Sequence, residues 1–373
     1  MKKILIIVLF IIGLLGQTMA QVYTNKVVGK KHVSLADSLK SSAYPYSLPI
    51  WGAKATEKGY DLPYSAGVSV NYFWQQSDLV INDLFVGFNN GPMYDLDELI
   101  RFDDAVSTAS VLTMRPDIWL FPFLNVYGIF SKAKTSTEIS AGVWLPDTAN
   151  VWNEVASFSS KANFDATGMG IGITPTIGIG GGWMALDMNV TWTDVSALNK
   201  PVVSFVFGPR FGKSFKFNNP QRNLAVWAGG FRVHLSSETN GSLFLSDVIP
   251  TDELQVKVDQ GIENVADAAV QVDAWWNGLT PPQQQNPVNV AKYETANRVI
   301  GKTGAFLNSA DAALNDEESA TVQYSLTKRP KNMWNFIVGA QFQLNKHFMA
   351  RAEYGFLGSR QQFMTGLQYR FGL

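Results

Sequence analysis

His234 and Ser236 are the two side chains whose spacing suits nucleophilic chemistry. Residues two apart in an extended strand lie on the same face, so an imidazole and a hydroxyl at these positions can approach each other. A histidine placed in this way acts as a base toward the serine, and an acidic or amide side chain usually orients it. Glu238 and Asn240 are the nearest candidates for the orienting role. The pair therefore permits a lipid or ester hydrolase.

Other chemistry is not expected from the sequence. His32 and His347 have no companion at metal-ligand spacing and the chain contains no cysteine, so neither a metal site nor a disulfide framework is predicted. The glycine-rich run 178–182 is not followed by a helical pattern, which favours a turn over a phosphate-binding loop, and no cofactor is predicted. With 30 basic and 31 acidic residues, the near-neutral chain shows no signature of a nucleic-acid partner.

A larger group of polar side chains occupies every second position of otherwise apolar segments. A charge that faces lipid near the membrane midplane costs about 2 to 4 kcal/mol, so these residues are predicted to line an interior. The set is Arg115, Asp117, Asp187, Asn189, Arg210, Arg232, Arg351, Glu353 and Arg370. Its five cations outnumber its three acids, which predicts a mildly positive lumen. Either this lumen is a narrow pathway for small polar solutes, or arginines, carboxylates and amides fill it as a hydrogen-bonded core.

Strands of alternating polarity must position these side chains. About ten such segments run through 64–247 and 324–373, which predicts an antiparallel transmembrane β-barrel. Within 168–178 one face carries mostly glycine, which predicts extra width inside. Two segments, 65–88 and 124–146, exceed the ~9 to 11 residues that a tilted strand needs. Either they continue beyond the membrane as extended hairpins or they form additional strands, so eight to twelve strands are predicted.

Composition agrees with lipid-facing strands. Charged residues make up 16% of the chain, against about 25% in a typical soluble domain, and the sequence holds 24 Phe, 12 Tyr and 11 Trp. Aromatic girdles at the two membrane interfaces account for such an excess.

The first twenty residues are typical of an export signal. Lys2 and Lys3 precede an apolar run, 4–15, and Thr18-Met19-Ala20 forms a small-x-small cleavage site. The apolar run is shorter than the roughly 20 residues of a membrane-spanning helix. We therefore predict a removed signal peptide, 1–20, and export through the general secretory route.

The C-terminal strand resembles a known family. In Phe363–Leu373 the residues Phe363, Leu367, Tyr369, Phe371 and Leu373 share one face, and this aromatic-rich ending resembles the closing strand of bacterial outer-membrane β-barrel proteins. The resemblance implies a Gram-negative outer membrane as the location. It also implies a barrel-assembly machinery that reads this strand, and outer-membrane lipid and lipopolysaccharide as surroundings.

A shorter resemblance concerns His234 and Ser236. The run 234–241 resembles the His-x-Ser element of outer-membrane phospholipases and lipid A deacylases, which implies His234 as base and Ser236 as nucleophile. In those families Asn follows the serine, whereas Ser237 follows it here. Four apolar residues of this strand are predicted to face lipid: Trp227, Phe231, Val233 and Leu235. This assignment turns Arg232 and His234 inward.

The predicted organisation has four parts. After the signal, 21–63 is a periplasmic segment or partial plug, and 64–373 is the barrel. Within it, 243–327 breaks the alternation, and apolar residues from Ile262 to Trp276 and from Ala296 to Ala313 recur at helical spacing. We predict a helical hairpin on the outer side, which either packs on itself and the barrel rim or serves as a lid or partner-binding cap.

These features favour a non-enzymatic outer-membrane barrel, either a narrow porin-like channel for small polar solutes or a structural and interaction barrel. The alternative from a different class is the hydrolase that uses His234 and Ser236. A third interpretation is an adhesin or receptor that uses the long loops.

Overall fold

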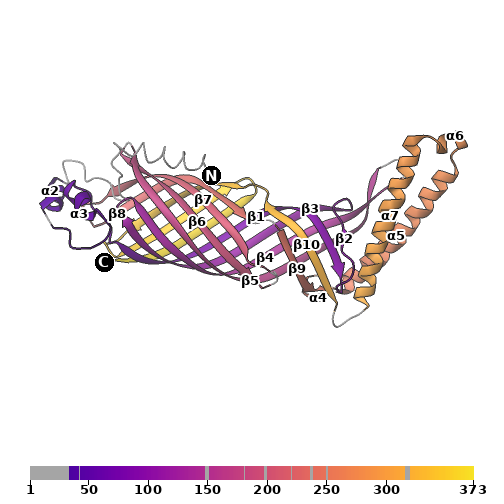
Figure 1. Cartoon of the computed structure of the whole chain (residues 1–373), viewed down its shortest axis with the longest axis horizontal. Coiled ribbons are helices and arrows are strands. Elements are labelled where there is room, and N and C mark those ends of the chain that lie inside the picture. The colour runs from indigo at the N-terminus through magenta and orange to yellow at the C-terminus, as the bar shows by residue number, and fades with distance from the viewer. Residues whose placement is uncertain are drawn as a thin grey trace.

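The computed structural model describes residues 33–41, 43–147, 151–179, 181–196, 200–219, 221–235, 238–248, 251–315 and 320–373. Within them, ten antiparallel strands form a closed barrel (Figure 1). The strands, in their order around the barrel, are β1 (Ala66–Phe88), β3 (Ile100–Phe121), β4 (Leu124–Pro146), β5 (Trp152–Ile179), β6 (Gly182–Val195), β7 (Val202–Lys216), β8 (Asn223–Leu235), β11 (Trp334–Gln343), β12 (Phe348–Leu357) and β13 (Arg360–Phe371). Pairing of β13 with β1 closes the ring, from Ala66 opposite Phe371 to Ser77 opposite Arg360. The predicted barrel of about ten strands is confirmed.

The outer face of the barrel carries an apolar band. On β5 it begins at Met169, whose side chain is 62% exposed, and ends at Ile179. This stretch matches the roughly 9 to 11 residues with which a tilted strand crosses a membrane. On β4 the exposed Phe130 pairs with Met169, whereas Lys132, one outward position further, pairs with Thr167. One edge of the band therefore lies at the same level on both strands.

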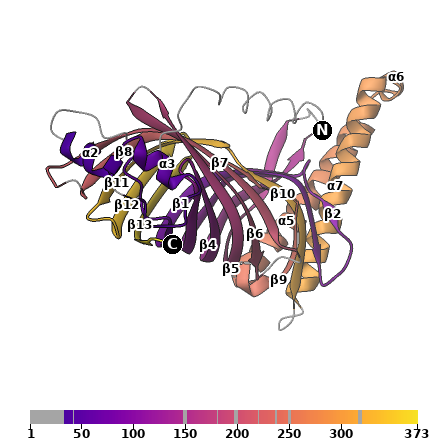
Figure 2. The same ribbon diagram turned by 60° about the vertical axis from the view of Figure 1, so that its left-hand side comes forward.

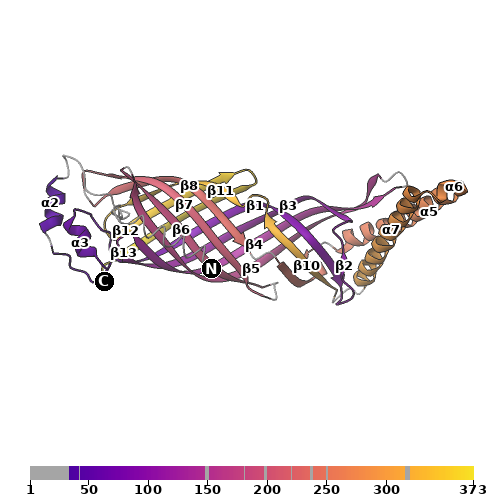
Figure 3. The same cartoon turned by 45° about the horizontal axis from the view of Figure 1, so that its top comes forward.

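Strands β1, β3, β4 and β5 continue past this edge (Figure 3). Up to Ser77, β1 pairs with β13, and from Leu79 onward it pairs with β10 (Thr321–Pro330) instead. The long segments 65–88 and 124–146 are therefore extended strands, not pairs of short ones. We call the part beyond the barrel the head. It comprises β2 (Tyr94–Asp95), β9 (Glu238–Phe244), β10, the adjoining ends of β1, β3, β4 and β5, and helices α4 (Leu245–Val248), α5 (Thr251–Asn277), α6 (Pro281–Gln284) and α7 (Pro287–Leu314).

The helical hairpin is present, but its predicted limits were too wide. Phe244 and Leu243 belong to β9, and 321–327 belongs to β10, which pairs with both β9 and β1. The helical interruption within 243–327 hid this pairing, because strands so far apart in sequence leave no local signal of their partnership. Apolar residues at alternate positions of β10 were nevertheless visible in the sequence.

Helices α5 and α7 pack on each other and on the sheet of the head. Val265 and Val272 of α5 meet Val299 of α7 in a core that also contains Leu96 and Leu99. Helix α7 begins with Pro287 at its first position, after Asn286, whose side chain accepts a hydrogen bond from the backbone N–H of Val288. None of the helices in the described ranges combines the length and apolar composition needed to cross a membrane.

A paired charge holds the hairpin to the turn between β2 and β3. Both terminal nitrogens of Arg298 donate to the carboxylate of Glu98 at 2.8 Å. This hydrogen bonding lowers the pKa of Glu98 below its ordinary value.

Helices α2 (Val33–Ser41) and α3 (Gly52–Glu57) lie at the opposite end of the barrel, near the C-terminus (Figure 2). The backbone N–H of Leu48 donates to the carbonyl of Leu373 at 3.2 Å, and that of Ile50 donates to Leu120 at 2.9 Å. Lys216 of β7 reaches Asp61 at 2.8 Å. The described part of the N-terminal segment is therefore bound across this mouth of the barrel.

Candidate functional site

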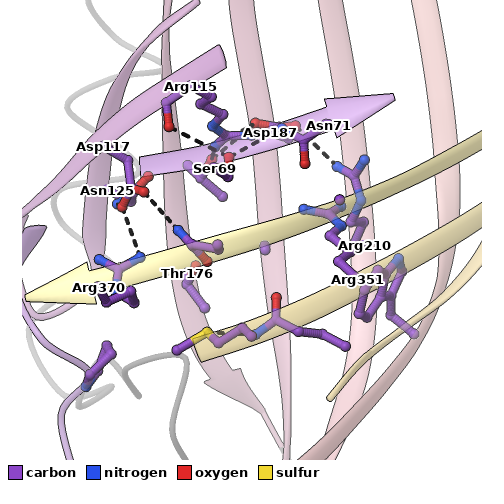
Figure 4. Close-up of a pocket in the computed structure, with 18 of the residues that line it drawn as sticks. Ser69, Asn71, Arg115, Asp117, Asn125, Thr176, Asp187, Arg210, Arg351 and Arg370 are labelled. Atoms are coloured by element: carbon purple, nitrogen blue, oxygen red, sulfur yellow. Dashed lines mark hydrogen bonds and ion pairs between the residues drawn. The ribbon is translucent and has the colours of Figure 1, made fainter. Parts of the chain in front are cut away.

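The polar side chains of the barrel converge on a lumen cavity of about 130 Å³ (Figure 4). Residues from all ten barrel strands and Pro63 of the N-terminal segment line it. Of the predicted lumen residues, those that line this cavity are Arg115, Asp117, Asp187, Arg210, Arg351 and Arg370. Asn189 and Glu353 hydrogen-bond within the same network.

Arg210 of β7 is the centre of this network. Its side chain is buried, and it donates from Nε and Nη2 to the two oxygens of Glu353 on β12 at 2.9 and 3.1 Å. Its Nη1 reaches Asp187 of β6 at 3.4 Å. One guanidinium therefore joins β6 and β12 across the lumen, in the fork geometry that makes arginine suited to carboxylates.

Glu353 accepts two further hydrogen bonds. The indole N–H of Trp227 donates to it at 2.8 Å, and Arg351 donates at 3.1 Å. A buried carboxylate is costly to desolvate unless its lone pairs are used, and four donated hydrogen bonds meet that requirement here.

Asp187 accepts two further hydrogen bonds, from side chains of β4 and β5. The hydroxyl of Tyr127 donates to it at 2.6 Å and that of Thr174 at 2.9 Å. The guanidinium of Arg115 lies 3.3 Å from the centroid of the Tyr127 ring, a cation–π arrangement, and 3.9 Å from Asp187. Asn189 donates to the Tyr127 hydroxyl at 3.3 Å.

A second buried pair lies nearer the C-terminus. Arg370 donates to Asp117 at 2.9 Å and, through Nε, to the carbonyl of Tyr64 at 2.9 Å. Asn125 and Gln368 complete the shell of Asp117 at 2.8 and 2.7 Å. This pair therefore ties the first residues of the barrel to its last strand.

The glycines of β5 do not widen the lumen as predicted. A Cβ at Gly172 would overlap the ring of Tyr127, which occupies the space that the absent side chain leaves. Gly172 thus allows a large aromatic residue to enter the interior and reach Asp187. An alternating glycine face indicates close packing at this position as readily as an open pore.

The prediction for Arg232 was wrong. Arg232 is exposed, with its guanidinium 6.0 Å from the ring of Trp334, a residue exposed on the outer face. Trp227 is instead the inward residue of β8, because its indole N–H has a carboxylate partner in the lumen. Because Trp227 was predicted to face lipid, the predicted inner and outer faces of β8 are the reverse of those in the structure. Without Arg232, four of the predicted cations remain inside, against three acids.

The same inversion applies to His234, which is exposed on the outer face of β8. Ser236 lies outside the described residues, and the structure describes Glu238 only as a strand residue opposite Thr327. No group of three or more His, Asp or Glu residues in the described ranges is arranged to hold a metal ion.

Arg360 is a lumen residue that sequence reasoning missed. Its side chain is 1% exposed, and no described residue accepts a hydrogen bond from its three guanidinium nitrogens. The signal was available, since Arg360 shares its parity with the inward residues Gln362 and Arg370 of β13.

No protein-family model matches the sequence, and no curated protein matches it either. Among solved structures, the chain is similar to the transport unit of the autotransporter AIDA-I from Escherichia coli. The identity is 9% and the TM-score 0.32, over 92% of this chain and 100% of that one. It is also similar to the β-domain of the Bordetella autotransporter BrkA, at 9% identity and a TM-score of 0.29 over 82% and 100% of the two chains.

A third similar structure is an outer-membrane channel from Pseudomonas putida F1, at 11% identity and a TM-score of 0.25 over 83% and 96% of the two chains. At these values the matches carry no information about function. The barrel assignment rests on the closed strand order itself.

Proposed function

We propose that this chain is a non-enzymatic outer-membrane barrel whose membrane part is closed by its own side chains and serves to anchor the head outside the membrane. The observation that carries this proposal is the bridge from Arg210 to Glu353 and Asp187 across the lumen. Both members of its shortest pair are buried, with Arg210 6% and Glu353 4% exposed.

The outer-membrane location is supported by the apolar band and by the closed ring of strands. Closure leaves no unpaired strand edge within the hydrocarbon layer, which only barrels achieve among sheets. The C-terminal strand, with Leu367 70% exposed on its outer face, supports contact with lipid and with the assembly machinery. We further propose that the head projects to the outer side, as an extended surface for lipopolysaccharide or a protein partner.

The small space that remains in the lumen supports this proposal. The cavity measures about 130 Å³, and side chains from the barrel strands line it together with Pro63 of the N-terminal segment. A conducting pore requires a continuous path of weak sites, whereas the carboxylates here are engaged by short hydrogen bonds. The polar side chains of the lumen therefore act as a hydrogen-bonded core instead of lining a pathway for solutes.

Single-channel recording of the refolded full chain in a planar bilayer tests this proposal. We expect no steady conductance from the wild type. The double variant Arg210→Ala, Glu353→Ala, which removes the bridge, should give measurable leak. The matched control removes the exposed ion pair of the head, Lys161→Ala with Glu138→Ala, and should stay silent. Regular unit conductance from the wild type would refute the closed-anchor proposal and support a narrow channel.

A further inference from the structure

The head encloses an apolar cavity of about 240 Å³, larger than the cavity in the lumen. Its lining comes from the paired strands β9, β10 and β1 and from the paired strands β3, β4 and β5. Helices α4, α5 and α7 contribute Leu245, Leu254 and Phe306 at one end. Apolar cavities of this kind stay dry and accept apolar ligands.

A bulge in β1 aligns its apolar side chains with this cavity. Leu79 and Ile81 line it before the bulge, and Leu84, Val86 and Phe88 line it afterwards. The register with β10 shifts by one residue between Asn82 and Phe85, and Asp83 has a φ of 52°. One extra residue reverses the alternation, so both halves of the strand present their apolar face to the same side.

The bulge is held from a neighbouring turn. The carboxylate of Asp97 accepts hydrogen bonds from the backbone N–H groups of Asp83 and Leu84, at 2.9 and 2.7 Å. These donors face away from the ladder at the bulge, and Asp97 satisfies them. The cavity is thus maintained by a specific local structure at its wall.

The charges around the cavity have one sign. Its lining contains two charged residues, Lys257 and Lys328, and no Asp or Glu. Lys328 lies at the end nearest the barrel, where it pairs with Ile81, and among the described residues no charged group acts on its ammonium. Lys257 of α5 is exposed and lies at the helical end, where the neighbouring Val258 packs with Phe88. Burial lowers the pKa of the Lys328 ammonium, because it has lost water and gained no partner.

Arg360 adds positive charge just beyond the end of the cavity that is nearest the barrel. It pairs with Ser77 of β1, and Leu79, the next residue on the same face, lines the cavity. Two residues along a strand correspond to about 6.6 Å. Toward the barrel the cavity therefore ends in the partly buried ammonium of Lys328. One layer beneath lies the guanidinium of Arg360, from which no described residue accepts a hydrogen bond.

We propose that this cavity binds a single-chain anionic amphiphile, with an acyl chain between the two sheets and a carboxylate on Lys328. An elongated apolar chain matches a lining in which Leu, Ile, Val and Phe predominate. A carboxylate matches a lysine that lacks a partner among the described residues, in a lining without acidic side chains. The site lies in the head, so the proposal holds whether or not the barrel conducts ions.

Binding is measured with the full chain in nanodiscs, using cis-parinaric acid as a fluorescent probe and palmitate as competitor. We expect saturable binding by the wild type. Lys328→Met should weaken palmitate roughly ten- to hundred-fold, as expected for loss of a hydrogen bond to a charged group, and should leave hexadecanol unchanged. Lys257→Met, the matched control at the other end, should change neither affinity by more than about twofold.

Two further measurements separate this site from simple partition into lipid. Ala162→Trp places an indole in the cavity and should abolish saturable binding of both palmitate and hexadecanol. A parinaroyl phospholipid, tested beside the free acid, should bind more weakly. Equal losses of palmitate and hexadecanol in Lys328→Met would overturn the assignment of the carboxylate. Binding of the phospholipid alone, or equal binding by the wild type and Ala162→Trp, would overturn the proposal.

Discussion

Replacing Glu353 by glutamine tests whether the buried network controls the stability of the barrel. Glu353 accepts four hydrogen bonds from Arg210, Trp227 and Arg351 at 2.8 to 3.1 Å. Glutamine has nearly the same size but no charge. Its amide N–H₂ group would also face the N–H donors that now bind the carboxylate of Glu353. Arg210 would keep only Asp187, at 3.4 Å, as an ionic partner. The buried guanidinium of Arg210 and the partly buried one of Arg351 would then share too little negative charge.

The expected loss is about 3 to 5 kcal/mol in the free energy of unfolding, the range for breaking one partner of a buried ion pair. The control is Glu138→Gln, which removes an ion pair with Lys161 whose side chains are 58% and 61% exposed. Such surface pairs contribute at most about 1 kcal/mol. The assay is urea unfolding of the barrel in lipid vesicles, followed by tryptophan fluorescence and by the mobility shift of the folded barrel on gels.

The double variant Arg210→Gln, Glu353→Gln completes a mutant cycle. Because it removes one positive and one negative charge together, its loss should be smaller than the sum of the two single losses. If Glu353→Gln unfolds within 1 kcal/mol of the wild type, or no more easily than Glu138→Gln, the network is not the stabilising element that its geometry indicates. An additive cycle would likewise refute direct coupling of the two residues.

Two further predictions concern packing and pH. Gly172→Ala should cost about 1 to 3 kcal/mol in the same unfolding assay, because the new methyl displaces the Tyr127 ring. Gly301→Ala is its control: a Cβ there meets nothing within 4 Å in helix α7, so stability should rise by about 0.5 to 1 kcal/mol, and equal effects would contradict the packing argument. The pair of Glu98 with Arg298 stabilises the docked hairpin above the ordinary pKa of about 4.5, because the folded-state pKa is lowered, and this contribution is lost as the pH falls through the folded value. The difference in melting temperature between the wild type and Glu98→Gln should therefore be present at pH 7 and shrink as the pH is lowered below about 4.5, and a difference that stays constant on acidification would exclude this linkage.

Much of the barrel was predictable because lipid imposes a local rule on each strand. Alternation placed Arg210 and Glu353 inside, and it predicted about ten strands, since each segment shows its faces without reference to its neighbours. The rule failed on β8, where Trp227 is both aromatic and a hydrogen-bond donor. An indole with a buried carboxylate partner is more stable inside than at the lipid surface, and the partner lies on β12, far away in sequence.

Local patterns in the chain are enough to predict the repeating strands, the helical hairpin and the residue types of the interior, because periods of two and of 3.6 residues are properties of short segments. The packing of distant strands established which arginine meets which carboxylate and that Tyr127 fills the space at Gly172. It also decided that β1 leaves β13 for β10 at Leu79. That change of partner creates the cavity of the head, and it depends on a one-residue bulge and on strands more than two hundred residues apart, which no local pattern encodes.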